Sequence, residues 1–206
     1  MPKVYLDPGH GGDDPGATGN GLVEKDINLA IARHARQHLA RHGLAVRMSR
    51  STDRSKSLRA RTHEANAWGA DIYVSVHCNA YVDASARGFE VWHSVQPGSR
   101  GRILARYLVQ WMDRLTPLVN RGARSRAGRG GRDAYYVIRE SRMPAVIVEC
   151  GFITNPGDAR YLGSASGQAR LAAAIARGVL QYFGRSGVPH QYRRPAPGAP
   201  RRGGRV

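Results

Sequence analysis

The sequence contains little of what defines several common protein classes. Its two cysteines among 206 residues are too few for a scaffold held together by disulfides. It has no apolar run of about 18 residues, the length that a membrane-spanning helix needs. Met1-Pro2-Lys3 leads directly into an apolar segment, which leaves no room for the charged and apolar regions of a signal peptide. We therefore expect a protein that is made in the cytoplasm without a signal peptide and has no transmembrane segment.

Acidic residues are also scarce, because 15 Asp and Glu stand against 32 Lys and Arg, for a formal net charge of +17. Such an excess favours an anionic partner, for example nucleic acid or a phosphate-rich bacterial wall. The arginines concentrate at 121–132 and 185–206, where solvated, solubilising segments are the alternative. The second segment is rich in Pro, Gly and Arg and cannot fold alone. We therefore predict one folded domain at 1–184 and a basic C-terminal tail at 185–206.

Strand-like and helix-like patterns alternate along the chain. Short apolar, β-branched runs predict strands at 3–7, 45–49, 72–77, 88–93, 135–139 and 145–150. Apolar residues at helical spacing predict helices at about 24–42, 57–68, 101–115 and 168–183. This alternation is typical of an α/β protein. We predict a single domain with a mainly parallel, twisted sheet of roughly six strands, flanked by helices on both faces.

Three of the predicted strands end in a residue that can bind a metal or move a proton. These residues are His10 after VYLDPG, His77 after IYVSV and Glu149 after AVIV. Because the carboxyl ends of parallel strands form the ligand crevice of such a sheet, we expect the three side chains to meet. Glu24, at the start of the first helix, joins them on the same side. Two imidazoles and two carboxylates suit a hydrolytic zinc site with an open position for water.

Each of these residues alone has a structural alternative. A histidine at a strand end is often only hydrogen-bonded, and a glutamate beside a Gly turn can cap a helix. Glu149 carries the most weight, because burying an unpaired carboxylate costs several kcal/mol or raises its pKa. Cys78 and Cys150 each follow one of these residues directly, so strand alternation turns both thiols toward the core. A disulfide between them, or a role as metal ligands, is the alternative.

Four segments in order resemble the zinc-dependent N-acetylmuramoyl-L-alanine amidases of the Amidase_3 family: VYLDPGHGG, GLVEKDINLA, SVHCNA and MPAVIVECGFITN. The resemblance covers about residues 3–183. It implies that His10, Glu24 and His77 bind Zn²⁺, and that Glu149 is the catalytic glutamate. It further implies hydrolysis of the amide between N-acetylmuramic acid and the L-alanine of the peptidoglycan stem peptide. In such a site a zinc-activated water attacks, with the glutamate as general base.

The resemblance also suggests a biological setting. The segment between His77 and Glu149 contains no candidate for a helix that blocks the site, so we expect a constitutively open enzyme. We expect it to act as a monomer on the anionic cell wall, with the basic tail contributing to wall binding. A single-domain amidase without a signal peptide resembles either a phage endolysin, released through a holin pore, or a mother-cell lysis enzyme.

Two other functions compete with the amidase. A zinc peptidase of the same fold, cutting within the stem peptide, would use the same metal site, because the metal residues fix the chemistry and not the substrate groove. A nucleic-acid-binding protein would explain the positive charge. However, no recognisable nucleic-acid motif is present, and we expect no nucleic acid as a partner.

Five further residues have weaker assignments. Asp7 is expected to orient a zinc-binding histidine. Arg50 follows a strand on the crevice side and suits either a stem-peptide carboxylate or a surface salt bridge. His34, His38 and His42 recur at helical spacing beside an apolar stripe. We expect them to pack at the edge of the core, with a second metal site as the alternative.

Overall fold

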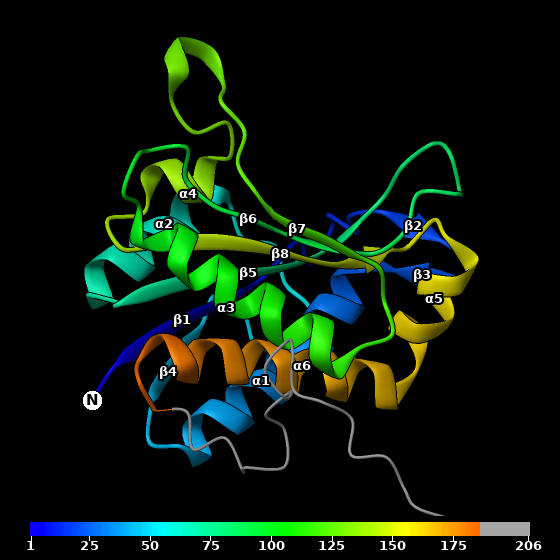
Figure 1. Ribbon diagram of the computed structural model, residues 1–206, viewed down its shortest axis with the longest axis horizontal. Coiled ribbons are helices and arrows are strands. Elements are labelled where there is room, and N and C mark those ends of the chain that lie inside the picture. Colours follow the sequence, from blue (N-terminus) through cyan, green and yellow to red (C-terminus); the bar gives the residue numbers. More distant parts are fainter. Residues whose placement is uncertain (186–206) are drawn as a thin grey trace, which may run out of the picture.

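The computed structural model describes residues 1–185, so the predicted tail falls, apart from Arg185, outside the described residues. Its centre is a six-stranded sheet in the order β4-β1-β5-β8-β6-β7 (Figure 1). The strands are β1 (Lys3–Pro8), β4 (Ala45–Met48), β5 (Ile72–Asn79), β6 (Phe89–Trp92), β7 (Asn120–Arg124) and β8 (Ala145–Phe152). Neighbours are parallel, except that β6 runs antiparallel to β8. The predicted mainly parallel sheet is confirmed.

Helices cover both faces of this sheet, as predicted (Figure 1). On one face lie α1 (Glu24–Arg41), α3 (Arg100–Leu115) and α6 (Ala165–Tyr182). On the other face lie α2 (Leu58–Trp68) and α4 (Tyr136–Glu140). The helix α5 (Pro156–Gly163) connects β8 to α6, and a small hairpin of β2 (Thr18–Gly19) and β3 (Leu22–Val23) precedes α1. None of the helices within residues 1–185 combines the length and hydrophobicity needed to cross a membrane.

Alternation along the strands divides the core into two layers. Cys78 on β5 and Cys150 on β8 belong to the large core that the sheet shares with α1, α3 and α6. Ile147 on β8 belongs to a smaller cluster between the sheet and the pair α2 and α4. Since successive side chains face opposite ways, His77 and Glu149 lie on this second face. Both cysteines are buried and free, which confirms their predicted packing role.

One predicted strand is wrong, because the segment at 135–139 forms the helix α4. Its residues Val137 and Ile138 are buried against the sheet instead of within it, and this burial explains the apolar pattern. The sixth strand is instead β7, an edge strand with the sequence NRGAR that is half-buried to exposed. An edge strand with so little buried surface needs no apolar alternation, so the sequence carried no signal for it.

His34 and His38 on α1 and His42 just after it are not grouped as potential metal ligands within the described residues. His34 and His42 are exposed, whereas His38 is half-buried at the edge of the core. Within residues 1–185, the group of side chains that could hold a metal ion lies elsewhere. The predicted packing at the edge of the core is therefore correct for the middle histidine, and the other two are surface residues.

Candidate active site

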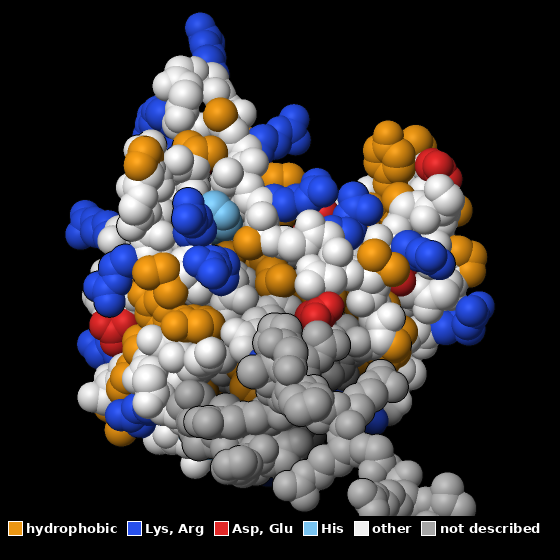
Figure 2. Space-filling view, viewed as in Figure 1, with side chains coloured by type: hydrophobic (Ala, Val, Ile, Leu, Met, Phe, Trp, Pro, Cys, Tyr) orange, Lys and Arg blue, Asp and Glu red, His pale blue; other side chains and the backbone are white. Residues whose placement is uncertain are grey.

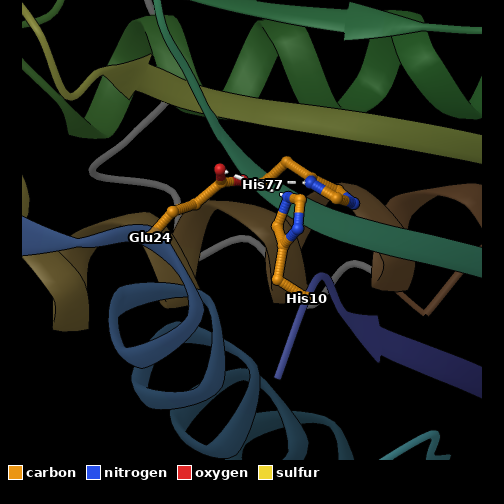
Figure 3. A group of neighbouring side chains, drawn as sticks. All are labelled: His10, Glu24 and His77. Carbon is orange, nitrogen blue, oxygen red and sulfur yellow. Dashed lines mark hydrogen bonds and ion pairs between the residues drawn. The ribbon is translucent and has the colours of Figure 1, made fainter. Parts of the chain in front are cut away.

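Three side chains that lie far apart in the sequence meet at the carboxyl end of the sheet (Figure 3). They are His10 in the loop after β1, Glu24 at the start of α1, and His77 on β5. Their potential ligand atoms all lie within 4.8 Å of one another. Two imidazole nitrogens and one carboxylate oxygen form a donor set that catalytic zinc sites use. The residues therefore fit a zinc ion.

Glu24 lies at the centre of this cluster and is only 3% exposed. Its Oε1 accepts a hydrogen bond from the backbone N–H of Cys78 (3.0 Å), and its Oε2 accepts one from that of Ala17 (2.8 Å). The nearest imidazole nitrogens, of His77 and His10, lie 3.0 and 3.3 Å from the two oxygens. Burial raises the pKa of Glu24, but the histidine hydrogen bonds lower it well below its usual range. The carboxylate is thus ionised, as a metal ligand must be.

Asp14 fixes the orientation of His10. The carboxylate of Asp14 lies 2.8 Å from Nδ1 of the imidazole and accepts a hydrogen bond from it, whereas Nε2 lies 3.3 Å from Oε2 of Glu24. Nε2 is therefore the nitrogen that could give up its proton to a metal ion. The backbone at His10 has a φ of 60°, an unusual value for a residue with a side chain. This local conformation turns the imidazole back toward the cluster. Asp14 stands in the same acidic, Gly-rich loop, but its role was not predicted from the sequence.

Two glycines permit this crowded arrangement. A Cβ atom on Gly9 would lie 2.1 Å from Cε1 of His77, far too close to the imidazole ring for the ring to stay where it is. A Cβ atom on Gly16, whose φ is +68°, would lie 2.6 Å from Oε2 of Glu24. Any side chain at either position would displace a member of the cluster, so these glycines are required by close approach and not only by turn geometry.

Arg50 has neither of the two roles considered for it. It is fully buried, and its guanidinium donates to the backbone carbonyls of Pro8 (3.1 Å), Gly9 (2.8 Å) and Lys25 (2.7 Å). It therefore joins the loop before His10 to the first turn of α1. Because it holds two segments that carry potential ligands, Arg50 stabilises the site from beneath and cannot reach a substrate.

Asp7 pairs with a second buried arginine, so the expectation that it orients a histidine is wrong. Its carboxylate accepts from Arg61 Nη1 (2.6 Å), the hydroxyl of Tyr73 (2.6 Å) and that of Ser75 (2.9 Å). Arg61 also donates to the backbone carbonyl of His10 (2.8 Å). Burial raises the pKa of Asp7, but the charge of Arg61 and the hydrogen bonds lower it below its usual value. This ion pair braces the loop that carries His10.

Glu149 lies in one row with two other side chains. It pairs with His77 across β5 and β8, and with Glu90 across β8 and β6. Burial raises the pKa of Glu149 to about 7; the charge of His77 lowers it, and those of Glu24 and Glu90 raise it. Glu90, which was not predicted from the sequence, is buried and accepts from Arg121 Nε (2.9 Å). The sequence did contain a signal for Glu90, because a carboxylate stands within the otherwise apolar strand FEVW.

Two cavities flank the cluster. One, of about 410 Å³, is lined by His10 and His77 among others, and the second, of about 390 Å³, by Glu149 and Glu90 among others. Tyr135 lines both cavities. A larger cavity of about 760 Å³ lies at the β4 edge of the sheet and includes none of these residues. Both volumes fall within the range of ligand-binding pockets.

The site is open in this structure. The side chains of His10 and His77 are 26% and 23% exposed. Of the two α-helices between His77 and Glu149, α3 packs against α6 and α4 packs against α2. Neither helix therefore packs over the cluster, in agreement with the expected open site. That the enzyme is open under all conditions stays a prediction.

Comparison with known proteins points to one family. The family described as N-acetylmuramoyl-L-alanine amidase, Amidase_3, matches residues 4–181. The chain is 41% identical over 181 residues to the uncharacterized protein YqiI of Bacillus subtilis, covering 87% of this chain and 84% of that protein. It is 37% identical over 185 residues to the sporulation-specific N-acetylmuramoyl-L-alanine amidase of Bacillus subtilis, covering 89% and 69%.

A solved structure agrees. The N-acetylmuramoyl-L-alanine amidase AmiC2 of Nostoc punctiforme superposes with a TM-score of 0.81 and 34% identity, covering 89% of this chain and 98% of that chain. The match at 4–181 includes every element that carries the His/Glu/His cluster and Glu149. The chain therefore belongs to the N-acetylmuramoyl-L-alanine amidase family, Amidase_3.

Proposed function

We propose that this protein is a zinc-dependent peptidoglycan hydrolase. It cleaves the amide between the lactyl group of N-acetylmuramic acid and the L-alanine of the stem peptide. Membership of the amidase family supports the choice of bond. The zinc dependence rests on His10, Glu24 and His77, whose potential ligand atoms lie within 4.8 Å of one another. Three protein ligands leave one position of a tetrahedral zinc ion for a reactant.

The three ligands would be held in place by their own neighbours. When bound, zinc supplies a Lewis acid that polarises the amide carbonyl and brings the pKa of water toward 7. The backbone N–H groups of Ala17 and Cys78 hold the carboxylate of Glu24. Asp14 keeps the proton on Nδ1 of His10 and leaves Nε2 available as a ligand. The chain thus prepares the ligand atoms before the ion arrives.

Glu149 would act as the general base and then as the general acid. It accepts a proton from the attacking water and returns it to the nitrogen of the leaving alanine. Its pairing with His77 on the adjacent strand places its carboxylate beside the cluster. Burial raises its pKa above the usual range, which favours return of the proton to the leaving nitrogen. A strand holds such a group more rigidly than a loop does.

The proposal is tested by the fragments released from peptidoglycan. Purified protein is incubated with peptidoglycan as isolated, after chelator treatment and after zinc is restored, and the products are identified by mass spectrometry. We expect free stem peptides that begin at L-alanine, lost with chelator and regained with zinc. Peptides cut within the stem would instead identify a zinc peptidase of the same fold. No release in the presence of zinc would contradict both activities.

We further propose that the enzyme reaches the wall after release from the cytoplasm and acts there as a monomer. Similarity to a sporulation-specific amidase supports a mother-cell setting, and the endolysin setting stays the alternative. The net charge of +17 supports attraction to an anionic wall. Light scattering on the purified protein tests the monomer: a mass near 22.5 kDa is expected, and a mass near twice that value would contradict it.

A further inference from the structure

A basic arm borders the cavity beside Glu149. The arm, residues 125–134, projects between β7 and α4 (Figure 1) and carries arginines at its tip and along its length. Figure 2 shows Lys and Arg side chains on this projection and around the hollow beside it. Arg126 of the arm and Tyr81 of the loop after β5 both line the cavity of about 390 Å³. The cavity beside Glu149 thus lies between the arm and that loop.

The arm is held at its base by defined contacts. The backbone N–H of Ala134 donates to the carbonyl of Arg126 (3.0 Å), which closes the base. Asp133, the one acidic residue in the arm, is buried. Its carboxylate accepts from the hydroxyl of Ser94 (2.7 Å) and the backbone N–H of Val95 (2.6 Å). The carboxylate is therefore used as an anchor and does not neutralise the arginines of the arm.

Three arginines near this cavity differ in their electrostatic partners. Arg121 donates to Glu90 (2.9 Å), and Arg124 lies 3.4 Å from the same carboxylate. Arg126 forms no ion pair with a carboxylate within residues 1–185. Burial raises the pKa of the phenol of Tyr135, and the nearby guanidinium of Arg126 lowers it. Two arginines line this cavity, and Arg126, which interacts with the phenol of Tyr135, is the one without a carboxylate partner within residues 1–185.

The orientation of the substrate follows from the proposed function, on which this inference rests. Glu149 returns a proton to the leaving nitrogen, so that nitrogen and the stem peptide attached to it lie on the side of Glu149. The muramoyl half then occupies the other cavity, beside His10. The second residue of a stem peptide carries an α-carboxylate when it is not amidated. Only the L-alanine residue separates this carboxylate from the scissile amide, so the carboxylate is close enough to that bond to enter the same cavity, of about 390 Å³.

We infer that Arg126 binds the free α-carboxylate of the second stem-peptide residue and makes the enzyme prefer stem peptides that are not amidated there. A guanidinium is suited to this role, because its planar donors match both oxygens of a carboxylate. The anchored base of the arm reduces the conformational entropy lost when the ligand binds.

The test compares two synthetic muramoyl tripeptides that differ only at this group, free or amidated. The zinc-loaded full chain should cleave the free acid with a kcat/KM about tenfold higher, the size expected for a charge-assisted hydrogen bond. Arg126→Gln should bring the ratio close to one, and Arg126→Glu should invert it. Inversion cannot result from partial unfolding, which lowers both rates alike. Arg129→Gln at the tip of the arm is the matched control and should keep the wild-type ratio.

The outcomes separate this inference from the proposed function. Equal kcat/KM for both substrates in the wild type overturns the role of Arg126 and leaves the amidase in place. The same follows if Arg126→Gln and Arg129→Gln both keep the wild-type ratio. If the zinc-loaded wild type cleaves neither tripeptide, the proposed function fails, and the inference fails with it.

Discussion

Glu149 and His77 lie directly beside each other on the adjacent parallel strands β8 and β5. The hydrogen-bonded ladder between the two strands therefore sets the spacing between the proposed base and a proposed zinc ligand. Glu90 continues the row on β6. A sheet that positions all three side chains leaves the loops free to shape the substrate cavities.

Replacing the proposed base should remove activity without removing the metal. Glu149→Gln keeps the size of the side chain but cannot accept a proton, so we expect kcat to fall by about 10²–10⁴-fold. Zinc content, measured by atomic absorption, should stay at the wild-type level. Glu140→Gln, on the partly exposed end of α4, is the control and should keep wild-type kcat. Near-normal turnover of the Glu149 variant would exclude the role proposed for it.

Asp14 should affect zinc affinity through His10. Asp14→Asn weakens the hydrogen bond that fixes the imidazole, so we expect zinc affinity to fall by about 10–100-fold. Competition with a chromogenic chelator measures this affinity. Asp13→Asn is the matched control, because Asp13 is exposed and precedes Asp14 directly. Equal affinities for the two variants would show that Asp14 has no orienting role.

Gly9 should tolerate no side chain. Gly9→Ala places a methyl group in steric clash with the ring of His77, so the imidazole must move. We expect weaker zinc binding and a loss of about 1–3 kcal/mol in the free energy of unfolding, as for overpacking elsewhere. Chelator competition and urea unfolding measure the two effects. Gly157→Ala is the control for zinc affinity: its Cβ would meet only the capping oxygen of Asn155, at 3.1 Å and away from the cluster, so zinc affinity should stay at the wild-type value. Wild-type zinc affinity in Gly9→Ala would contradict the close approach of the imidazole to Gly9.

The ion pair between Asp7 and Arg61 should make stability depend on acid pH. The folded-state pKa of Asp7 lies below its unfolded value of about 3.9. The stabilisation is therefore complete above that unfolded value and is lost as the pH falls through the folded pKa. Asp7→Asn should cost about 3–5 kcal/mol at neutral pH, because it leaves a buried guanidinium without its partner. It should also reduce the acid dependence.

Urea unfolding at several pH values between neutral and acid measures this dependence. Asp113→Asn is the control, because Asp113 lies on the surface, where its carboxylate accepts a hydrogen bond from the side chain of Asn120. If Asp7→Asn and Asp113→Asn unfold with the same free energy at neutral pH, the buried pair contributes nothing to stability.

The sequence alone was sufficient to predict that the residues of the cluster lie close together. His10, His77 and Glu149 each follow an apolar run, and the rule that parallel strands end at one edge placed them side by side. The same argument located Glu24, because a helix that follows a strand begins at that edge. These predictions depend on topology alone, and the topology is strongly marked in the apolar pattern.

The supporting residues could not be predicted, because their roles depend on directions that only the folded chain defines. Asp7 and Asp14 lie on either side of His10 in the sequence, and only the folded chain shows that Asp14 contacts the imidazole whereas Asp7 pairs with Arg61. Arg50 looks like a surface residue in the sequence, yet the carbonyls that surround it come from Pro8, Gly9 and Lys25. A local sequence pattern cannot predict contacts between residues that lie 25 to 42 positions apart.

The missed helix α5 differs, because a local signal was present. Asn155 precedes Pro156, and a capping residue followed by proline is a common helix start. The side chain of Asn155 accepts from the backbone N–H groups of Gly157 and Asp158, as a cap does. The short length of the helix, eight residues, hid its periodicity.

Because side chains alternate between the two faces of a strand, the row across β5, β8 and β6 depends on the exact register of each strand. From Ala145 to Cys150 on β8, odd-numbered residues face α2 and α4, and even-numbered residues enter the large core. One residue inserted or deleted early in this strand would exchange the two sets. The thiol of Cys150 or the side chain of Val148 would then stand beside His77, and a carboxylate would enter the core. Length variation should therefore be confined to the loops and the basic arm, whereas the strands accept only substitutions.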